Sequence, residues 1–355
     1  MENKEIGSEF WRGCTKTDGR GVSEIIPNGF DAKIVLSGRT ALEIIVKDAI
    51  KNFGIKSAYL PSYCCHTMIE PFERHGVKLK FYPVFFTDNG ISASFDKDNG
   101  CQLVYLIDYF GFLNKETEMF GKQQVEHGKI VIYDATHSLF CKNVNYSYCQ
   151  YVFGSFRKWF GVNSAFCSKK EGWEAFPELK ENTVYTDMRN SAFELKYDYI
   201  VNSKANKDVF LKTFSEAEES LENDYSEYGA DELSKKLLSE VDCDRIFEQR
   251  RDNVKYLMEC LSENESFCLP YRKLGTDECP LFLPVRIKQD KRGELRTHFI
   301  KNSIYLPIHW PVSDLHEKYG LSSEIYLEEL SVVCDQRYSI EDMQKTVSVK
   351  NEFYG

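Results

Sequence analysis

Short apolar runs separated by helical stretches constrain the fold of this chain more than any other feature. The runs at 103–107, 130–133 and 151–156 are rich in β-branched and aromatic residues. Runs this short are typical of strands buried on both faces of a parallel sheet. Because parallel strands are joined through helices, the pattern predicts an α/β fold with a mostly parallel central sheet flanked by helices.

A helical stripe precedes these runs. Apolar residues recur at positions 42, 45, 46, 49, 50 and 53, which places them on one face of an α-helix. Gly54 supplies a C-terminal stop for that helix. Strands at 57–60 and 78–84, with a helix at 67–75 between them, continue the alternation.

The length of 355 residues exceeds what one compact core usually holds, so two domains are predicted. Residues 1–30 are polar and read as an irregular N-terminal arm. Residues 31–240 form the large α/β domain of this prediction. Residues 241–355 form a smaller C-terminal α+β domain, with strands at 281–287 and 303–307 and a helix at 339–347.

Composition excludes several classes of protein. The chain has 45 Lys and Arg against 55 Asp and Glu, a formal net charge of −10, which disfavours nonspecific binding to nucleic acid or to anionic membranes. No apolar run has the length of a membrane span, and the N-terminus lacks the apolar core of a signal peptide. We expect a soluble, cytoplasmic protein with neither nucleic acid nor membrane as a partner.

The twelve cysteines are scattered, without a Cys-x-x-Cys pair, and we expect them to stay reduced. The densest group is Cys64-Cys65-His66. Adjacent cysteines chelate a metal poorly, and no second pair completes four ligands, so no metal site is predicted.

Three patches follow the predicted strands or open the predicted helix. Ser37-Gly38-Arg39-Thr40 begins the helical stripe, where free backbone N–H groups can bind an anion, although an ordinary helix cap explains the serine equally. Asp134 ends the run at 130–133, and a carboxylate there needs a cationic partner unless it caps the next segment. His137, three residues on, is by itself more often structural.

The third patch holds Lys158 between aromatic residues, just after the run at 151–156. Burial lowers the pKa of a lysine and raises the share of neutral, nucleophilic amine. The alternative is a surface lysine whose stem covers Trp159.

Taken together, the patches match the needs of pyridoxal 5'-phosphate (PLP). This cofactor needs a lysine for its Schiff base, an acid for its pyridine nitrogen and a cup for its phosphate. The chain offers them in the order cup, acid, lysine, with Lys158 following Asp134 by 24 residues. Ligands of such sheets bind beyond the carboxyl ends of the strands, which is where both residues fall.

These patches resemble the motifs of the DegT/DnrJ/EryC1/StrS aminotransferases, a family of fold-type I PLP-dependent enzymes. The resemblance spans nearly the whole chain and rests on segments at 37–42, 60–63, 133–138, 155–158, 250–253 and 335–338. It implies that Lys158 forms the Schiff base and moves the substrate proton, and that Asp134 holds the pyridine nitrogen. It also implies a place near the ring hydroxyl for His137, and phosphate contacts from Gly38, Arg39, Thr40 and Ser155.

The chain also departs from the family pattern. The position that usually stacks an aromatic side chain on the cofactor ring corresponds to Cys65, so Tyr63 or His66 is expected to take that role. The glycine-rich segment that follows the lysine in sugar aminotransferases is not clear at 160–164, which leaves the substrate open. Arg337 is a candidate for binding a substrate carboxylate, with a structural ion pair as the alternative.

The resemblance implies a PLP-dependent aminotransferase that moves an amino group from a donor such as glutamate to a keto acceptor, a nucleotide-linked keto sugar being one acceptor class. It also implies a homodimer with the active site at the subunit boundary. Two alternatives stay open: a PLP enzyme of the same fold with another reaction, such as a dehydratase or an enzyme acting on a non-sugar amine, and a non-catalytic scaffold. A nicotinamide dehydrogenase is disfavoured because no Gly-x-Gly-x-x-Gly follows a strand.

Overall fold

The computed structural model describes residues 5–12 and 21–355. Within them lies a seven-stranded sheet in the order β2-β10-β9-β8-β7-β3-β4. The strands are β2 (Asp31–Val35), β3 (Ser57–Pro61), β4 (Lys78–Tyr82), β7 (Leu103–Ile107), β8 (Ile130–Asp134), β9 (Tyr151–Ser155) and β10 (Ala165–Lys169). Strands β4, β3, β7, β8 and β9 run parallel, while β10 is antiparallel to both neighbours. The predicted mostly parallel α/β sheet is confirmed.

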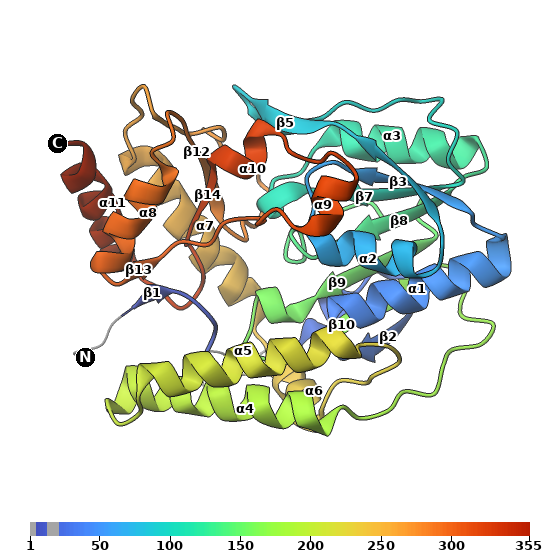
Figure 1. The fold of residues 1–355 in the computed structure, drawn as a ribbon, viewed down its shortest axis with the longest axis horizontal. Coiled ribbons are helices and arrows are strands. Elements are labelled where there is room, and N and C mark those ends of the chain that lie inside the picture. The colour runs from blue at the N-terminus through green and yellow to red at the C-terminus, as the bar shows by residue number, and fades with distance from the viewer. Residues whose placement is uncertain (1–4, 13–20) are drawn as a thin grey trace.

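Helices cover both faces of this sheet. Helix α3 (Lys115–Glu126) lies on one side, and α1 (Gly38–Phe53) and α2 (His66–Arg74) lie on the other (Figure 1). Helix α1 begins where the Ser37 hydroxyl accepts a hydrogen bond from the Thr40 N–H, and it ends at Gly54 in the left-handed conformation. Both ends therefore follow the local signals of the sequence.

A three-stranded antiparallel sheet forms the core of the C-terminal part. Its strands are β11 (Phe267–Cys268), β12 (Leu283–Ile287) and β14 (Glu329–Val332). The helices of this part are α7 (Cys243–Cys260), α8 (Arg292–Lys301), α9 (Asp314–Lys318), α10 (Glu324–Glu328) and α11 (Ile340–Tyr354). This part lies beside the larger sheet (Figure 1).

The strand predicted at 303–307 is shorter than expected. Only β13 (Ile304–Tyr305) is extended in a ladder, and it pairs with β1 (Ile6–Gly7) of the N-terminal arm. The strand predicted at 78–84 is likewise divided, because Pro83 separates β4 from a hairpin of β5 (Val84–Thr87) and β6 (Gly90–Ala93).

A long helical hairpin completes the fold. Helices α4 (Thr183–Tyr197) and α5 (Lys207–Asn223), joined through a π-helical turn at Asp198–Asn202, run along one edge of the molecule (Figure 1). The remaining elements are helix α6 (Glu232–Ser239) and three 3-10 turns at Val22–Ile25, Tyr109–Gly111 and Phe156–Lys158. Of the helices that the structure describes, none is both long and apolar enough to cross a membrane.

The core of the large sheet is closely packed. Every residue of β7 and β9 is buried, and each large apolar side chain there contributes roughly 1.5–3 kcal/mol through burial. On the α3 side, a Cβ atom added to Gly121 would lie 2.3 Å from Tyr148 Cε2 and 2.7 Å from Leu106 Cδ1. Only glycine therefore lets α3 approach the sheet this closely.

We predict that Gly121→Ala lowers the free energy of unfolding by about 1–2 kcal/mol, because overpacking outweighs the gain in helix propensity of about 1 kcal/mol. The matched control is Gly293→Ala in α8, where an added Cβ meets open space. The control should leave stability unchanged or raise it by up to about 1 kcal/mol. Urea unfolding measures both, and equal stability changes in the two variants would contradict this packing.

Candidate active site

A cavity of about 300 Å³ lies at the carboxyl ends of β8 and β9, beside the first residues of α1 and α2. This is the edge at which open α/β sheets bind ligands. Seven of the residues singled out in the sequence line it: Gly38, Arg39, His66, Asp134, His137, Ser155 and Lys158. Cys65 lines it as well.

The start of α1 forms one end of this cavity. A Cβ atom on Gly38 would lie 3.3 Å from Ser155 Cβ, so glycine keeps the approach between α1 and β9 open. The Nη1 atom of Arg39 is buried and has no hydrogen-bond partner among the described residues. A helix N-terminus together with an unpartnered guanidinium donor fits a phosphate group.

Thr40 belongs to the same turn but does not line the cavity. Its side chain is fully buried, and its hydroxyl donates a hydrogen bond of 2.6 Å to the Tyr225 carbonyl. Thr40 therefore joins α1 to the segment that follows α5.

Asp134 is the last residue of β8, and it lines the same cavity as Gly38 and Arg39. Its Oδ1 accepts a hydrogen bond of 2.8 Å from the Thr136 N–H, and its Oδ2 accepts one of 2.6 Å from the Tyr105 hydroxyl. Burial raises the pKa of this carboxyl group, although these hydrogen bonds and the charge of Lys158 act against the rise. No described residue forms an ion pair with the Asp134 carboxylate. The protonated ring nitrogen of a ligand would supply the positive charge beside this carboxylate.

Lys158 ends the 3-10 turn after β9 and lines the same cavity as Asp134. Its amine makes no hydrogen bond or ion pair with any residue that the structure describes. Burial lowers its pKa, and the nearby Arg157 guanidinium lowers it further. Both effects increase the share of neutral, nucleophilic amine near neutral pH.

His137 is buried on the cavity wall. Its Nδ1 accepts a hydrogen bond of 3.2 Å from the Phe110 N–H, and burial lowers its pKa to about 3. The ring is therefore neutral at physiological pH, with Nε2 left to carry the proton. A neutral imidazole donor of this kind suits an oxygen of a ligand.

Trp310 is an aromatic wall residue that the sequence analysis missed. Its ring lies 5.4 Å from the ring of His137, with an angle of 28° between the two planes. It comes from the chain after β13, far along the sequence from the other wall residues, and no local pattern marks it. An aromatic residue near position 65 was expected, and the structure brings one to the cavity from position 310.

Tyr63 lies outside the cavity. It is completely buried, its hydroxyl donates to the His309 carbonyl, and its ring packs 5.0 Å from the ring of Trp310. Its place is thus behind Trp310 rather than beside a ligand.

Cys65 and His66 form a polar pair on the wall, at the start of α2. The Cys65 Sγ lies 3.8 Å from His66 Nδ1 and accepts a hydrogen bond of 3.2 Å from the Thr67 hydroxyl. Burial alone would raise the pKa of this thiol, but these contacts outweigh it and lower the pKa to about 7. The contact with Cys65 in turn raises the pKa of His66, although burial acts against this.

Glu218 of α5 is a further wall residue that the sequence analysis missed. Its carboxylate accepts hydrogen bonds from Arg157, from Arg39 at 3.3 Å and from Arg189 at 3.3 Å. Burial would raise its pKa, but the charges of Arg157 and Arg189 outweigh that and lower it. This cluster attaches the α4–α5 hairpin to the end of the cavity at which α1 begins.

Arg337 lies away from this cavity, on the wall of a second one. It pairs with Asp335 through Nε and Nη2, at 2.8 and 2.7 Å, and it donates to the carbonyls of Ser8 and Glu9. The structural ion pair therefore exists, and it holds the N-terminal arm. Binding of a substrate carboxylate by Arg337 stays a prediction.

Comparison with family models and with curated proteins finds no match. Solved structures do match. The Helicobacter pylori aminotransferase PseC, involved in the biosynthesis of pseudoaminic acid, is 12% identical, with 98% of this chain and 99% of that chain covered and a TM-score of 0.64. A DegT/DnrJ/EryC1/StrS aminotransferase from Brucella abortus is 14% identical, with 96% and 92% covered and a TM-score of 0.60.

NtdA from Bacillus subtilis, solved with bound cofactor PMP, is 13% identical, with 90% of this chain and 72% of that chain covered and a TM-score of 0.55. The chain has the fold-type I aminotransferase architecture. The predicted fold class and the resemblance to this family are thereby confirmed at the level of the fold. At 12–14% identity, a shared fold does not show a shared substrate or reaction. The function is therefore inferred from the residues of the site.

We predict that Cys65 is the fastest-reacting of the thiols in 5–12 and 21–355. Because its pKa lies near 7, below that of an unperturbed cysteine, the thiolate forms as pH rises through that value. The rate of carbamidomethylation by iodoacetamide should therefore have its midpoint near pH 7. Cys65→Ser should remove the fast phase; a fast phase that persists in this variant, or a midpoint above pH 8, would contradict the geometry.

Proposed function

We propose that the protein is a PLP-dependent aminotransferase that moves an amino group from a donor such as glutamate to a keto acceptor. The observation that carries the proposal is the meeting of Lys158, Asp134 and the start of α1 on one cavity. These residues are far apart in sequence, and the sheet topology brings them to one edge. The lysine, acid and phosphate cup are the three features that PLP chemistry needs from a protein.

The residues of this cavity fit the cofactor at both ends. The backbone at Gly38, the free Nη1 of Arg39 and Ser155 would hold the phosphate. Asp134 would keep the ring nitrogen protonated, and the neutral His137 would donate toward the ring hydroxyl. When bound, PLP supplies a carbonyl carbon that accepts an amine and a conjugated ring that withdraws electrons from the substrate carbon.

Lys158 has two tasks in this proposal. The lowered pKa of its amine raises the share of the neutral form, which is the nucleophile of the site. Once its nitrogen is free again, Lys158 Nζ would take the proton from the substrate carbon and deliver it to the carbonyl carbon that the cofactor supplies, which is general base and then general acid work. The lowered pKa serves both tasks, because an amine that is always protonated can neither attack nor accept a proton.

The proposal extends to the acceptor, assembly and location. A nucleotide-linked keto sugar is the acceptor class we favour, on the motif resemblance. We further propose a cytoplasmic homodimer with the active site at the subunit boundary. We also propose domain limits near residues 30 and 240, supported by a seven-stranded sheet that lies wholly within 31–240.

The experiment is a spectroscopic test of the PLP-loaded protein. We expect a yellow absorbance band that borohydride fixes covalently, with mass spectrometry locating the adduct on Lys158. Addition of L-glutamate should convert the band to that of the pyridoxamine form. Lys158→Ala should lose the adduct and about 10²–10⁴ of the half-reaction rate, while Lys170→Ala, at an exposed lysine on the opposite edge of the sheet, should keep both.

The outcomes separate the candidate functions. An adduct on another lysine would contradict the proposed site. An adduct on Lys158 without a glutamate-dependent change would retain the cofactor and contradict transamination, as expected for a dehydratase. Absence of any adduct in a folded, PLP-saturated sample would favour the non-catalytic scaffold.

A further inference from the structure

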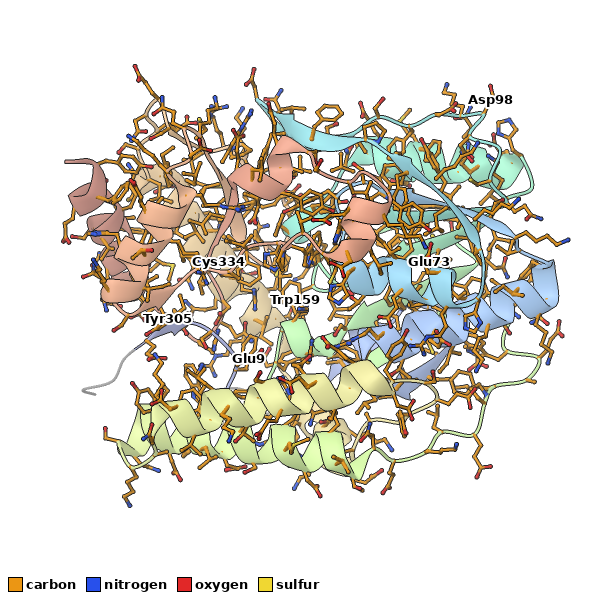
Figure 2. The ribbon with its side chains drawn as sticks, viewed as in Figure 1. Glu9, Glu73, Asp98, Trp159, Tyr305 and Cys334 are labelled. Atoms are coloured by element: carbon orange, nitrogen blue, oxygen red, sulfur yellow. The ribbon has the colours of Figure 1, made fainter. Side chains whose placement is uncertain are left out.

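A second cavity of about 400 Å³ begins at Lys158, and it shares Lys158 and Arg157 with the first cavity. Figure 2 labels Glu9 and Tyr305 on two of its walls, between the C-terminal part and helix α5. His309, from the chain between β13 and α9, lines another wall. A substrate that reacts at Lys158 therefore has space on this side, and His309 borders that space.

A hydrogen-bonded chain of three polar side chains leads from this wall into the protein. Glu329 and Ser331 lie two residues apart on β14, so their side chains project from the same face of the strand. The Ser331 hydroxyl lies 2.5 Å from Glu329 Oε1 and 2.9 Å from His309 Nδ1. Glu329 and Ser331 are completely buried, and His309 is 6% exposed. The chain thus joins a carboxyl group in the core to an imidazole on the cavity wall.

Backbone contacts hold this chain in place. The Ser331 N–H donates to the Pro307 carbonyl at 3.0 Å, and the His309 N–H donates to Glu329 Oε2 at 2.7 Å. The Tyr63 hydroxyl donates to the His309 carbonyl. Because Nδ1 of His309 is turned toward Ser331, Nε2 is the ring nitrogen that remains. Nε2 makes no hydrogen bond with any residue that the structure describes, so it is left for a ligand in the cavity.

Glu329 is a carboxyl group without a charge partner. No residue in 5–12 or 21–355 forms an ion pair with it. Arg292 of α8 contributes positive charge nearby, but its Nη1 donates to the carbonyls of Tyr326 and Glu329 rather than to the carboxylate. Burial raises the pKa of the Glu329 carboxyl to about 8, although the hydrogen bonds that it accepts and the charge of Arg292 act against the rise. Most of this group is therefore protonated at neutral pH.

The His309 ring, in contrast, stays neutral. Burial lowers its pKa well below the ordinary value, and the charges of His137 and Lys158 lower it further. Of the groups that act on the chain, Tyr63 stays protonated, because burial holds its pKa well above the ordinary value, and Arg292 stays charged. A neutral imidazole carries one proton, which is bound to either Nδ1 or Nε2.

The protonation of Glu329 sets which ring nitrogen carries that proton. When Glu329 is protonated, it donates to Ser331, Ser331 donates to Nδ1 of His309, and the ring proton is on Nε2. When Glu329 is ionised, Ser331 donates to the carboxylate, Nδ1 donates to Ser331, and Nε2 carries a lone pair. In passing from the first state to the second, one proton moves from Glu329 to Ser331, one moves from Ser331 to Nδ1, and one leaves Nε2 for an acceptor in the cavity.

We propose that Glu329, Ser331 and His309 form a proton relay, and that His309 Nε2 is a further catalytic group that exchanges a proton with a substrate oxygen in the second cavity. This inference rests on the proposed function for its substrate, because an amine nitrogen that replaces a carbonyl oxygen releases that oxygen as water. Two protons reach the oxygen and two leave the nitrogen. Nε2 delivers the proton with which the C–O bond breaks, and the last proton that the nitrogen loses refills the relay.

The first experiment reads the relay in the cofactor-free protein. Nitrogen NMR of protein with isotope-labelled histidine shows which ring nitrogen carries the proton, and the His309 signals are identified by their loss in His309→Gln. We expect the proton on Nε2 at about pH 6.5 and on Nδ1 at about pH 9.5, with a midpoint near pH 8. A histidine with a merely structural role would keep its proton on one nitrogen over this range.

Glu329→Gln removes the titrating group and keeps its shape. Because an amide always has a proton to donate, Nε2 should carry the ring proton at every pH, and the midpoint near pH 8 should disappear. Glu328→Gln is the matched control: Glu328 pairs with Arg286 instead, so the His309 titration should persist. If Glu329→Gln fails to fold, Ser331→Ala interrupts the same chain and should also remove the midpoint.

Two results would overturn the relay. One is a wild-type His309 ring whose proton stays on the same nitrogen throughout the titration. The other is an exchange between the nitrogens that persists in folded Glu329→Gln or folded Ser331→Ala, because the titration of another group, such as Lys158, would then be its cause.

A kinetic readout tests the catalytic part and separates it from the proposed function. With pyridoxamine-loaded protein and 2-oxoglutarate as the probe acceptor, His309→Gln should lower the maximal rate by about 10²–10⁴ and leave the covalent adduct on Lys158 in PLP-loaded protein unchanged. The wild-type rate should fall as pH rises through about 8, and Glu329→Gln should lose this fall. An unchanged rate in folded His309→Gln would overturn the catalytic role and leave transamination standing. A Glu329-dependent exchange on His309 in a protein that shows no half-reaction would support the relay and contradict transamination.

Discussion

Two titratable groups withdrawn from water at the ends of adjacent strands set the constraint on which the site depends. Asp134 ends β8 and Lys158 follows β9, and within the described chain no ion pair neutralises either one. Burial raises the pKa of Asp134 and lowers that of Lys158, so each is driven toward its neutral form. A ligand with a basic ring nitrogen at one end and an electrophilic carbon at the other relieves both penalties. The sheet positions them for it, because parallel strands end at one edge.

Guanidinium groups organise the space around this pair. Glu218 forms ion pairs with Arg39, Arg157 and Arg189, and these pairs hold the α4–α5 hairpin beside the end of the cavity at which α1 begins. Asp335 forms an ion pair with Arg337. Arg337 in turn donates to the Glu9 carbonyl, and this contact holds the N-terminal arm on the wall of the second cavity. Paired arginines thus build the walls of both cavities, and the ion pairs join segments that lie far apart in the sequence.

Much of the sheet could be predicted, because uninterrupted apolar runs produced β7, β8 and β9 nearly to the residue. Strand β10 was missed, since its last residue, Lys169, is a buried lysine that pairs with Asp48 on α1, and no local rule anticipates that partner. Asp134 and Lys158 were found because PLP chemistry imposes their order along the chain. Trp310 was not, because its approach to the cavity depends on how the C-terminal part packs against the large sheet. The same holds for Glu218, whose ion pairs with arginines on other elements arise from contacts across long stretches of sequence.

A crystal structure of the protein incubated with PLP tests the central claim most directly. We predict density for the cofactor in the cavity between α1 and β8, continuous with the Lys158 side chain, and with the ring nitrogen within hydrogen-bond distance of Asp134. Cofactor density attached elsewhere, or a cavity that stays closed by its own side chains at saturating PLP, would contradict the account.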